Sequence, residues 1–271
     1  MNTPCVPEAS VTWRKFLDRL NKHYGRPTAA RGELLVRGHA CSAWTLAPTI
    51  DRGVDQAFIR RDRDVLARDL TRAFQHETLG LDIPLGSPVG EEEWELLGRH
   101  HGLSSRFLDW SRSPCIAAFF AFADPKCGLS HPVAVWVFDR QYFVSKGKLG
   151  VPGTPAGDPV ELPENYEHFR FNRRAVEQQA VFMRVATSKE AVELSLAGYL
   201  WKYVIPGPDR QAALTHLSAM GITWRSLFRD LDGAARSAAT RLLVEEADVS
   251  ETLSAVRSSR PQGPSQITIL N

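Results

Sequence analysis

Polar side chains that could bind a ligand are concentrated in residues 94–125, WELLGRHHGLSSRFLDWSRSPCIAAFFAFADP. Histidine, arginine, aspartate and serine residues lie there between two helical patterns. The first helix is predicted to begin in the acidic residues 91–93, which complement the positive end of the helix dipole, and to stop near Gly102. The second is predicted to begin after Ser113, a residue type that caps helices and is followed here by proline. Residues 100–112 are therefore expected to form a loop that presents its side chains in a defined geometry.

Several side chains of this stretch could contact a small molecule through hydrogen bonds, charge or ring stacking. The candidates are His101, Ser104, Ser105, Arg106, Asp109, Trp110, Ser113 and Phe120. A purely structural interpretation is also open, because buried charges are usually paired. Arg106 would then pair with Asp109, Trp110 would fill the core, and Ser113 would only cap its helix.

A second candidate site lies upstream, at the dipeptide formed by Arg37 and Gly38. Residues 33–37 are predicted to form a short strand that carries this pair to its end. Glycine lets a ligand approach the backbone, and the planar guanidinium can grip a pyrophosphate with two parallel hydrogen bonds. No metal site is predicted, since His100 and His101 have no third ligand at a useful spacing.

The elements that must position these residues follow from hydrophobic periodicity. Further strands are predicted at 133–138, 180–186 and 199–205, and helices at 11–22, 55–76, 211–220 and 224–243. Residues 145–165 are rich in glycine and proline and are predicted to form a flexible loop that closes over a site or links two halves. Strands mixed with at least five helices indicate an α+β fold. We predict one domain over residues 1–245, followed by a C-terminal tail, 246–271, that is loose after Ser250.

Composition narrows the class of protein. The 271 residues carry a formal charge of +2 and a pI near 8.4, so bulk charge implies no polyanionic partner. The four cysteines form no metal-binding or redox spacing, which favours a reduced, cytoplasmic setting. The longest apolar run, residues 115–123, is too short to span a membrane, and the N-terminus has no signal-peptide pattern, so no membrane partner is expected.

Four blocks of the sequence resemble the FRG domain family. The first is HHGLSSRFLDWSRSPCIAAFFAFA at residues 100–123, and the second is VRGH at 36–39 with Trp44 and Pro48 beyond it. The third is NRRAVEQQAVF at 172–182, and the fourth is LFRDLDGAA at 227–235. The four blocks occur in the same order as in the family, so together they are more specific than any single block.

The resemblance implies a fold and a ligand. FRG domains are similar to the ADP-ribosyltransferase fold, in which split mixed β-sheets, two small packed sheets surrounded by helices, enclose NAD. An arginine or histidine on the first strand, a hydroxyl on a middle strand and a glutamate or glutamine on a later strand surround the dinucleotide. Arg37, with Arg106, would then hold the phosphates of NAD, which is the substrate. Trp110 or Phe120 would stack on the nicotinamide, and Ser104, Ser105 or Ser113 would bond to the amide or the ribose.

The residue that faces the reacting ribose is the weakest part of this assignment. Cleaving the bond between nicotinamide and ribose builds positive charge on the sugar, which a carboxylate stabilises. The family pattern carries over to Gln178, a neutral amide, while Glu177 next to it could supply the charge. Neighbouring residues of a strand face opposite sides, so both reach the site only if the backbone bulges. Other departures from the pattern are Val36, Arg99 and Ala180, of which Ala180 could restrict a close approach of the ligand to the backbone.

The resemblance therefore predicts an NAD-dependent ADP-ribosyltransferase or NAD glycohydrolase, of the kind that serves as a bacterial toxin or an antiphage defence effector. Its expected partners are NAD, an unknown ADP-ribose acceptor, protein or nucleic acid, and a protein that neutralises it. The alternative is a non-catalytic module of the same fold that senses a nucleotide or docks a partner.

Overall fold

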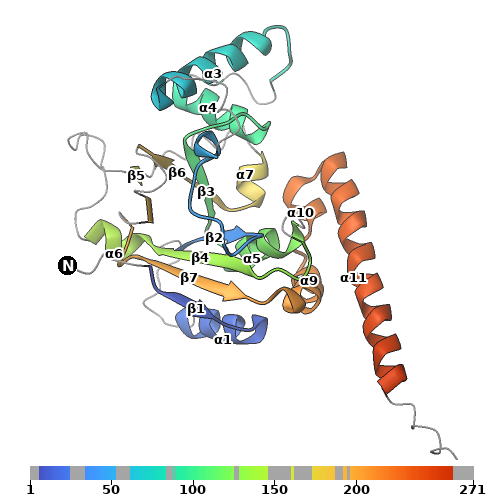
Figure 1. Cartoon of the computed structure of the whole chain (residues 1–271). Helices are drawn as coiled ribbons and strands as arrows, with labels where there is room; N and C mark the ends of the chain where they lie inside the picture. The colour runs from blue at the N-terminus through green and yellow to red at the C-terminus, as the bar shows by residue number, and fades with distance from the viewer. Residues whose placement is uncertain are drawn as a thin grey trace, which may run out of the picture.

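The computed structural model describes residues 6–24, 34–52, 62–83, 88, 90–124, 128–145, 160–161, 173–186, 192–193 and 196–258. These residues form helices that flank a mixed β-sheet (Figure 1). The α+β class predicted from the sequence is therefore confirmed.

The sheet has seven strands in the order β1-β7-β4-β2-β3-β6-β5. They are β1 (Glu8–Ser10), β2 (Leu34–His39), β3 (Phe107–Ser111), β4 (Val133–Asp139), β5 (Val160–Glu161), β6 (Ala180–Val185) and β7 (Leu200–Ile205). β1 runs parallel to β7, and the other neighbouring strands are antiparallel. β4 lies in the interior of the sheet, as its apolar sequence predicts, because both of its faces are buried.

The strand pairing of the sheet is shortest between β2 and β3. These two strands share one residue pair, Val36 with Ser111. The rest of β2 is in register with β4 alone, and residues 107–110 of β3 are in register with β6 alone. A four-strand half and a three-strand half therefore separate on one side of this pair. The Val36–Ser111 pair joins these halves into one hydrogen-bonded sheet, and the ADP-ribosyltransferase-like split sheets that the resemblance implied stay a prediction.

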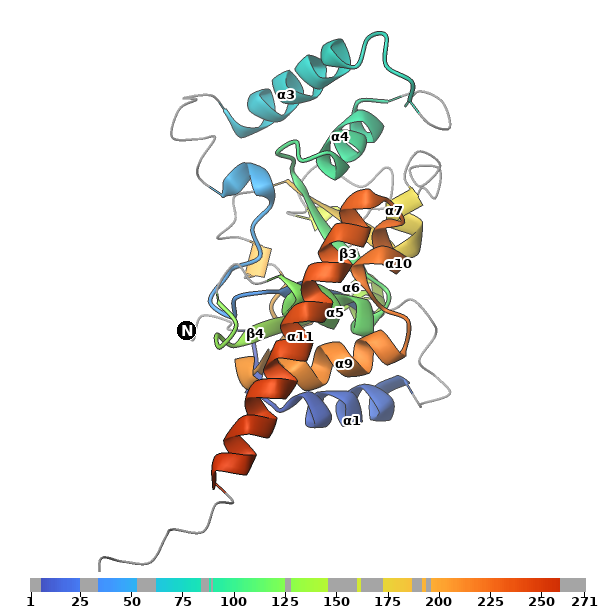
Figure 2. The same ribbon diagram turned by 90° about the vertical axis from the view of Figure 1, so that its right-hand side faces the viewer.

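One face of the four-strand half is covered by α1 (Trp13–Tyr24), α5 (Pro114–Ala123) and α9 (Arg210–Ala219), with α1 and α9 side by side in both views (Figures 1 and 2). Their apolar side chains, including Phe16, Ala118 and Leu217, are buried against Val36 and Val135 of the sheet. The capping predicted for α5 is confirmed, since the Ser113 side chain accepts a hydrogen bond from the Ile116 amide.

The remaining helices lie outside the layer formed by α1, α5 and α9. α3 (Arg63–Glu77) packs against α4 (Glu91–His100) beyond the end of β3 (Figure 1). α4 begins and ends as predicted, and Gly102 follows it with a φ of 96°. The others are α6 (Arg140–Ser145), α7 (Arg173–Glu177), α10 (Trp224–Phe228) and α11 (Leu231–Ser258), with short 3-10 turns η1 (Thr49–Asp51) and η3 (Gly207–Asp209).

The largest correction concerns residues 107–111, which were predicted to lie in a loop and instead form strand β3. Phe107, Leu108 and Trp110 are buried, and the strand pairs with β6 along its whole length. Burial of these apolar side chains fixes the strand in the sheet. Because side chains alternate along a strand, Asp109 and Ser111 face the side opposite to Leu108 and Trp110.

The structure also differs from three smaller predictions. Residues 173–177 are helical in α7, so Glu177 and Gln178 do not lie on a strand as expected. α11 continues to Ser258, beyond the predicted end at 243 and into the stretch expected to be loose. Within the predicted loop 145–165, residues 160–161 form β5, and residues 146–159 and 162–165 lie outside the described residues.

Candidate functional site

A pocket of about 360 Å³ opens where β2 and β3 separate. The strand side is formed by Arg37, Gly38 and His39 of β2 and by Asp109, Trp110 and Ser111 of β3. α4, α5, α7, α10 and the chain after β2 supply the remaining wall. The volume falls in the range of about 300–1,000 Å³ that is typical of small-molecule sites.

Arg37 bridges the gap between the separating strands. Its Nε donates a hydrogen bond to His39 Nε2 at 3.1 Å, and one terminal nitrogen donates to the Asp109 carbonyl oxygen at 2.5 Å. The structure records no hydrogen bond from its other terminal nitrogen to any described residue, and no described carboxylate forms an ion pair with it. Desolvation by burial and the nearby Arg52 and Arg99 lower the pKa of Arg37 to about 9, although Asp109 acts in the opposite direction. Arg37 is therefore a partly desolvated cation that an anionic ligand would stabilise.

The Asp109 carboxylate is held in the pocket by Arg99. Arg99 donates two parallel hydrogen bonds, from Nε to Oδ1 at 2.5 Å and from its terminal nitrogen to Oδ2 at 2.7 Å. Burial alone would raise the pKa of Asp109, but Arg99 and Arg37 lower it to about 2. The Asp109 side chain is 43% exposed, whereas that of Arg99 is 9% exposed. The pocket therefore contains an ionised carboxylate whose orientation is fixed by its two hydrogen bonds to Arg99.

The pocket carries more positive than negative charge. Arg52 lines it and is anchored by a 2.9 Å hydrogen bond from its Nε to the Ala47 carbonyl oxygen. Burial and the neighbouring Arg99 lower the pKa of Arg52. Arg174 also lines the pocket but is paired with Asp230. Arg37 and Arg52 are thus the two lining arginines for which the structure records no carboxylate partner among the described residues.

Aromatic rings form the opposite wall. Phe120 of α5 contacts Trp224 of α10 edge to face, with centroids 5.7 Å apart, and Phe228 lies 6.3 Å from Phe120. All three line the pocket together with Trp44, which is 36% exposed. Rings of this kind stack on planar heterocycles. Cationic and aromatic surfaces therefore face one space.

The two histidines of the pocket are neutral near physiological pH. Burial lowers the pKa of His39 well below its usual value, and Arg37 and Arg52 add to this effect. Burial likewise lowers the pKa of His100 to about 4, with smaller contributions from Arg99 and Arg174 and opposition from Asp109. His39 Nδ1 also lies 3.2 Å from the indole nitrogen of Trp136, which ties the ring to β4.

The predicted site residues divide into two groups. Those that line the pocket are Arg37, Gly38, Asp109, Trp110, Phe120 and Gln178. Those that do not line it are His101, Ser104, Ser105, Arg106, Ser113 and Glu177. Gln178 follows α7, and its backbone oxygen accepts a 2.8 Å hydrogen bond from the Ser111 hydroxyl.

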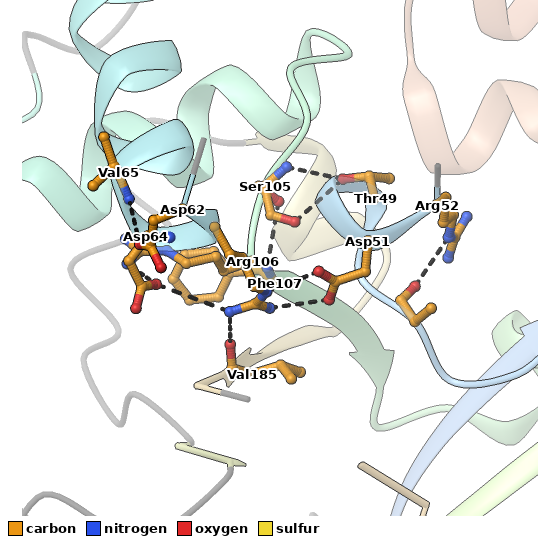
Figure 3. A network of polar contacts seen from close by, with 12 residues as sticks. Thr49, Asp51, Arg52, Asp62, Asp64, Val65, Ser105, Arg106, Phe107 and Val185 are labelled. Carbon is orange, nitrogen blue, oxygen red and sulfur yellow. Dashed lines mark hydrogen bonds and ion pairs between the residues drawn. The ribbon is translucent and has the colours of Figure 1, made fainter. Parts of the chain in front are cut away.

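Arg106 belongs to a separate buried network on the α3 side (Figure 3). Its guanidinium pairs with Glu95, which is 1% exposed, at 2.6 Å and with Asp64 at 3.1 Å. The pairing of Arg106 with Asp109, considered from the sequence, is therefore not formed. Arg63 donates to Asp51 and to the Val185 carbonyl oxygen in the same region, so these charges join α3 and α4 to the sheet.

The other residues outside the pocket have identifiable positions. Ser105 is buried, accepts a hydrogen bond from Arg99 at 3.1 Å, and donates its amide to Thr49 Oγ1 at 2.9 Å (Figure 3). It therefore positions Arg99, which in turn holds Asp109. Glu177 pairs with Arg229 at 3.0 Å, and Ser113 caps α5. His101 is exposed at the end of α4, and Ser104 follows it in the turn before β3.

The glycine at position 38 has a different physical role from the one predicted. A Cβ atom there would lie 1.9 Å from the Ala117 oxygen and 2.8 Å from the Ala121 nitrogen. Both are backbone atoms of α5, so Gly38 allows that helix to pack directly on β2. Close helix packing thus requires glycine at this position, independently of any ligand.

Sequence reasoning missed several of the polar residues that line the pocket. They are His39, Arg52, Arg99, His100 and Arg174. From the sequence, Arg99 was only a departure from the family pattern, but in the structure it fixes Asp109. A signal was present, because Arg99 stands ten residues before Asp109 across a predicted turn, and a buried carboxylate needs a cationic partner.

Comparisons with known proteins agree with the resemblance read from the sequence. The family model of the FRG domain matches residues 32–128, which include β2, α4, β3 and α5. The chain therefore carries an FRG domain, and this domain supplies Arg37, Arg99 and Asp109. A search of curated proteins and a search of solved structures found no match.

Two negative findings apply to the residues that the structure describes. None of their helices combines the length and apolar character needed to cross a membrane. They contain no group of three or more histidine, cysteine, aspartate or glutamate residues arranged to hold a metal ion.

Proposed function

We propose that the pocket between β2 and β3 binds NAD and that the protein is an NAD-dependent ADP-ribosyltransferase or NAD glycohydrolase. The observation that carries the proposal is the partly desolvated Arg37, which has a terminal nitrogen that no described residue uses, at the point where the sheet separates. A pyrophosphate offers the charge and acceptor oxygens that this guanidinium lacks. Arg52, on the same pocket, is the second cation available to the phosphates.

The remaining surfaces suit the other parts of the dinucleotide. Phe120, Trp224 and Phe228 offer rings on which a nicotinamide or adenine can stack. The volume of about 360 Å³ is at the small end of the usual range, so it suits the reacting half of NAD, with the adenosine extending toward the opening.

Cleavage requires a group that stabilises the developing ribosyl cation. Asp109 is ionised, half-exposed to the pocket and held by Arg99, so its negative charge needs no reorganisation during the reaction. Gln178 is placed to orient the ribose hydroxyls through its amide. In this arrangement the acceptor of ADP-ribose is water, a protein or a nucleic acid.

A second candidate function is a non-catalytic module that senses a nucleotide. It is favoured by a specific observation about the carboxylates. Gln178 is neutral, Glu177 is paired with Arg229, and Asp109 shares its negative charge with Arg99. A pocket of this kind would bind NAD or ADP-ribose without cleaving it.

Nicotinamide release from NAD by the purified protein tests the proposal. The wild type, Arg37→Ala, Asp109→Asn and Gln178→Ala are compared, with Arg241→Ala as a control that removes one exposed charge outside the pocket. Release by the wild type and the control, and its loss in Arg37→Ala, supports the enzyme. Binding of ADP-ribose without release, even when cell lysate is added as a source of acceptors, supports the sensing module instead.

Expression in cells gives an independent test of a role as a toxin or antiphage effector. A wild type that arrests growth, beside a folded Arg37→Ala variant that does not, supports such a role. Equal growth of both strains argues against it and leaves the chemistry to the release assay.

A further inference from the structure

The ring of His39 meets two N–H donors, one at each of its nitrogens. Arg37 Nε donates to its Nε2 at 3.1 Å, and the indole Nε1 of Trp136 donates to its Nδ1 at 3.2 Å. Burial lowers the pKa of this ring well below its usual value, and Arg37, Arg52 and Lys202 add to the effect, so the ring is neutral. A neutral imidazole carries one proton and has a single acceptor nitrogen. One of the two donors is therefore left without an acceptor, whichever nitrogen is protonated.

A carbonyl oxygen favours one tautomer in the absence of a ligand. His39 Nδ1 lies 3.4 Å from the Trp44 carbonyl oxygen, which only a protonated Nδ1 can satisfy. In that tautomer Nε2 accepts from Arg37, and a charge-assisted bond of this kind is about twice as strong as the neutral bond that Trp136 would make. The opposite tautomer would set the Nε2 proton against the Arg37 Nε proton. The ligand-free protein thus favours a protonated Nδ1, which leaves the indole of Trp136, 2% exposed, as the donor without an acceptor.

An anion bound to Arg37 reverses this preference. A phosphate that accepts two parallel hydrogen bonds from a guanidinium can use Nε together with a terminal nitrogen. Arg37 Nε then no longer needs His39, and the tautomer with an unprotonated Nδ1 gives the buried Trp136 indole its acceptor. One proton leaves Nδ1 and another reaches Nε2 through solvent water, so the ring stays neutral and no net proton is taken up. Trp136 does not line the pocket, so its effect on the ligand passes through His39.

We propose that His39 is a positioning residue for Arg37, which holds Arg37 Nε in the free protein and releases it to an anionic ligand by exchanging the protonated Nδ1 tautomer for the protonated Nε2 tautomer. The proposal rests on the proposed function in one respect, since it takes the phosphates of the dinucleotide as the anion. It goes further by making the affinity of the pocket depend on an indole outside it.

Nuclear magnetic resonance measures the tautomer directly, because protonated and unprotonated imidazole nitrogens have widely separated ¹⁵N shifts. The signals of His39 are identified in the labelled protein by their absence from His39→Asn. We expect a protonated Nδ1 in the free protein and a protonated Nε2 at saturating ADP-ribose. The indole N–H signal of Trp136, identified with Trp136→Phe, should shift on binding as it gains an acceptor.

A binding measurement tests the same coupling without spectroscopy. Trp136→Phe removes the indole N–H and keeps an aromatic ring, and we expect it to weaken ADP-ribose binding by about twofold to tenfold, the range of one neutral hydrogen bond. Trp13→Phe makes the same chemical change at another buried indole that does not line the pocket, and it should leave the affinity unchanged. Both variants should keep the tautomer that His39 has in the free protein.

A protonated Nε2 in the free protein, or ring signals that do not change at saturating ADP-ribose, would overturn the proposal. Equal affinity of Trp136→Phe and the wild type would overturn it too, because His39 would then hold Arg37 without exchanging partners. If the wild type binds no ADP-ribose at all, the proposed function is refuted, and this proposal with it.

Discussion

Replacing Arg37 with methionine should separate ligand binding from stability. Arg37 has one terminal nitrogen that no described residue uses, and it is the cation at the point where the two halves of the sheet diverge. A hydrogen bond to a charged partner contributes about 1.5–3 kcal/mol, so losing it should weaken ADP-ribose binding about 10- to 100-fold.

The free energy of unfolding should change much less, because two effects oppose each other. Removing a cation whose pKa is lowered to about 9, mainly by burial, relieves a desolvation cost at neutral pH. Against this, His39 Nε2 and the Asp109 carbonyl oxygen each lose a donor, at a cost of about 1–3 kcal/mol per group. We therefore expect a net change within about 2 kcal/mol.

Isothermal titration calorimetry with ADP-ribose and urea unfolding measure the two quantities on the same protein. Arg241→Met, which removes an exposed charge outside the pocket, should match the wild type in both. Wild-type affinity in Arg37→Met would refute the assignment of the phosphates to Arg37. A loss of affinity accompanied by unfolding would refute the balance of stability terms, and Arg37→Lys would then test whether charge alone restores binding.

The remaining predictions concern stability. Gly38→Ala should destabilise the protein by about 3 kcal/mol or more in urea unfolding, because its Cβ would overlap the Ala117 oxygen of the α5 backbone; a cost under about 1 kcal/mol would show that the helix moves freely. Glu95→Gln should cost about 3–5 kcal/mol, since it leaves the buried Arg106 without its main counter-ion, and an unchanged melting temperature would contradict this. The lowered pKa of Asp109 contributes stability that is present above pH 4 and is lost as pH falls toward 2. Because the side chain is half-exposed, we expect only about 1 kcal/mol, seen as a shallower acid unfolding profile in Asp109→Asn; parallel profiles would exclude it.

Local patterns in the sequence were enough for several elements of the fold. The acidic start of α4, the Ser113 cap of α5 and the apolar run of β4 were predicted correctly, because each depends on side chains close together in the chain. The four blocks also indicated the FRG domain, which the family comparison supports. Arg37 and Asp109 were identified as candidates, and the structure brings both to one pocket.

Tertiary structure decided what lies between those elements. The run from Phe107 to Ser111 was predicted as a loop because it lies between two predicted helices, but pairing with β6 makes it a strand. The same pairing leaves one residue pair to join β2 to β3, and that single contact creates the pocket.

Spacing along the sequence likewise could not predict which charged residues pair. Arg106 and Asp109 stand three residues apart and looked like partners, yet Arg106 pairs with Glu95 and Asp109 with Arg99. Arg106 lies just before β3 and Asp109 lies within it, and each pairs with a different residue of α4. The sequence by itself thus determined α4, α5, the strand β4 and the resemblance to the FRG domain, because these follow from neighbours along the chain. Only the tertiary structure decided which arginine keeps its charge available to a ligand. This depends on which groups, distant in the sequence, lie close to the buried guanidinium.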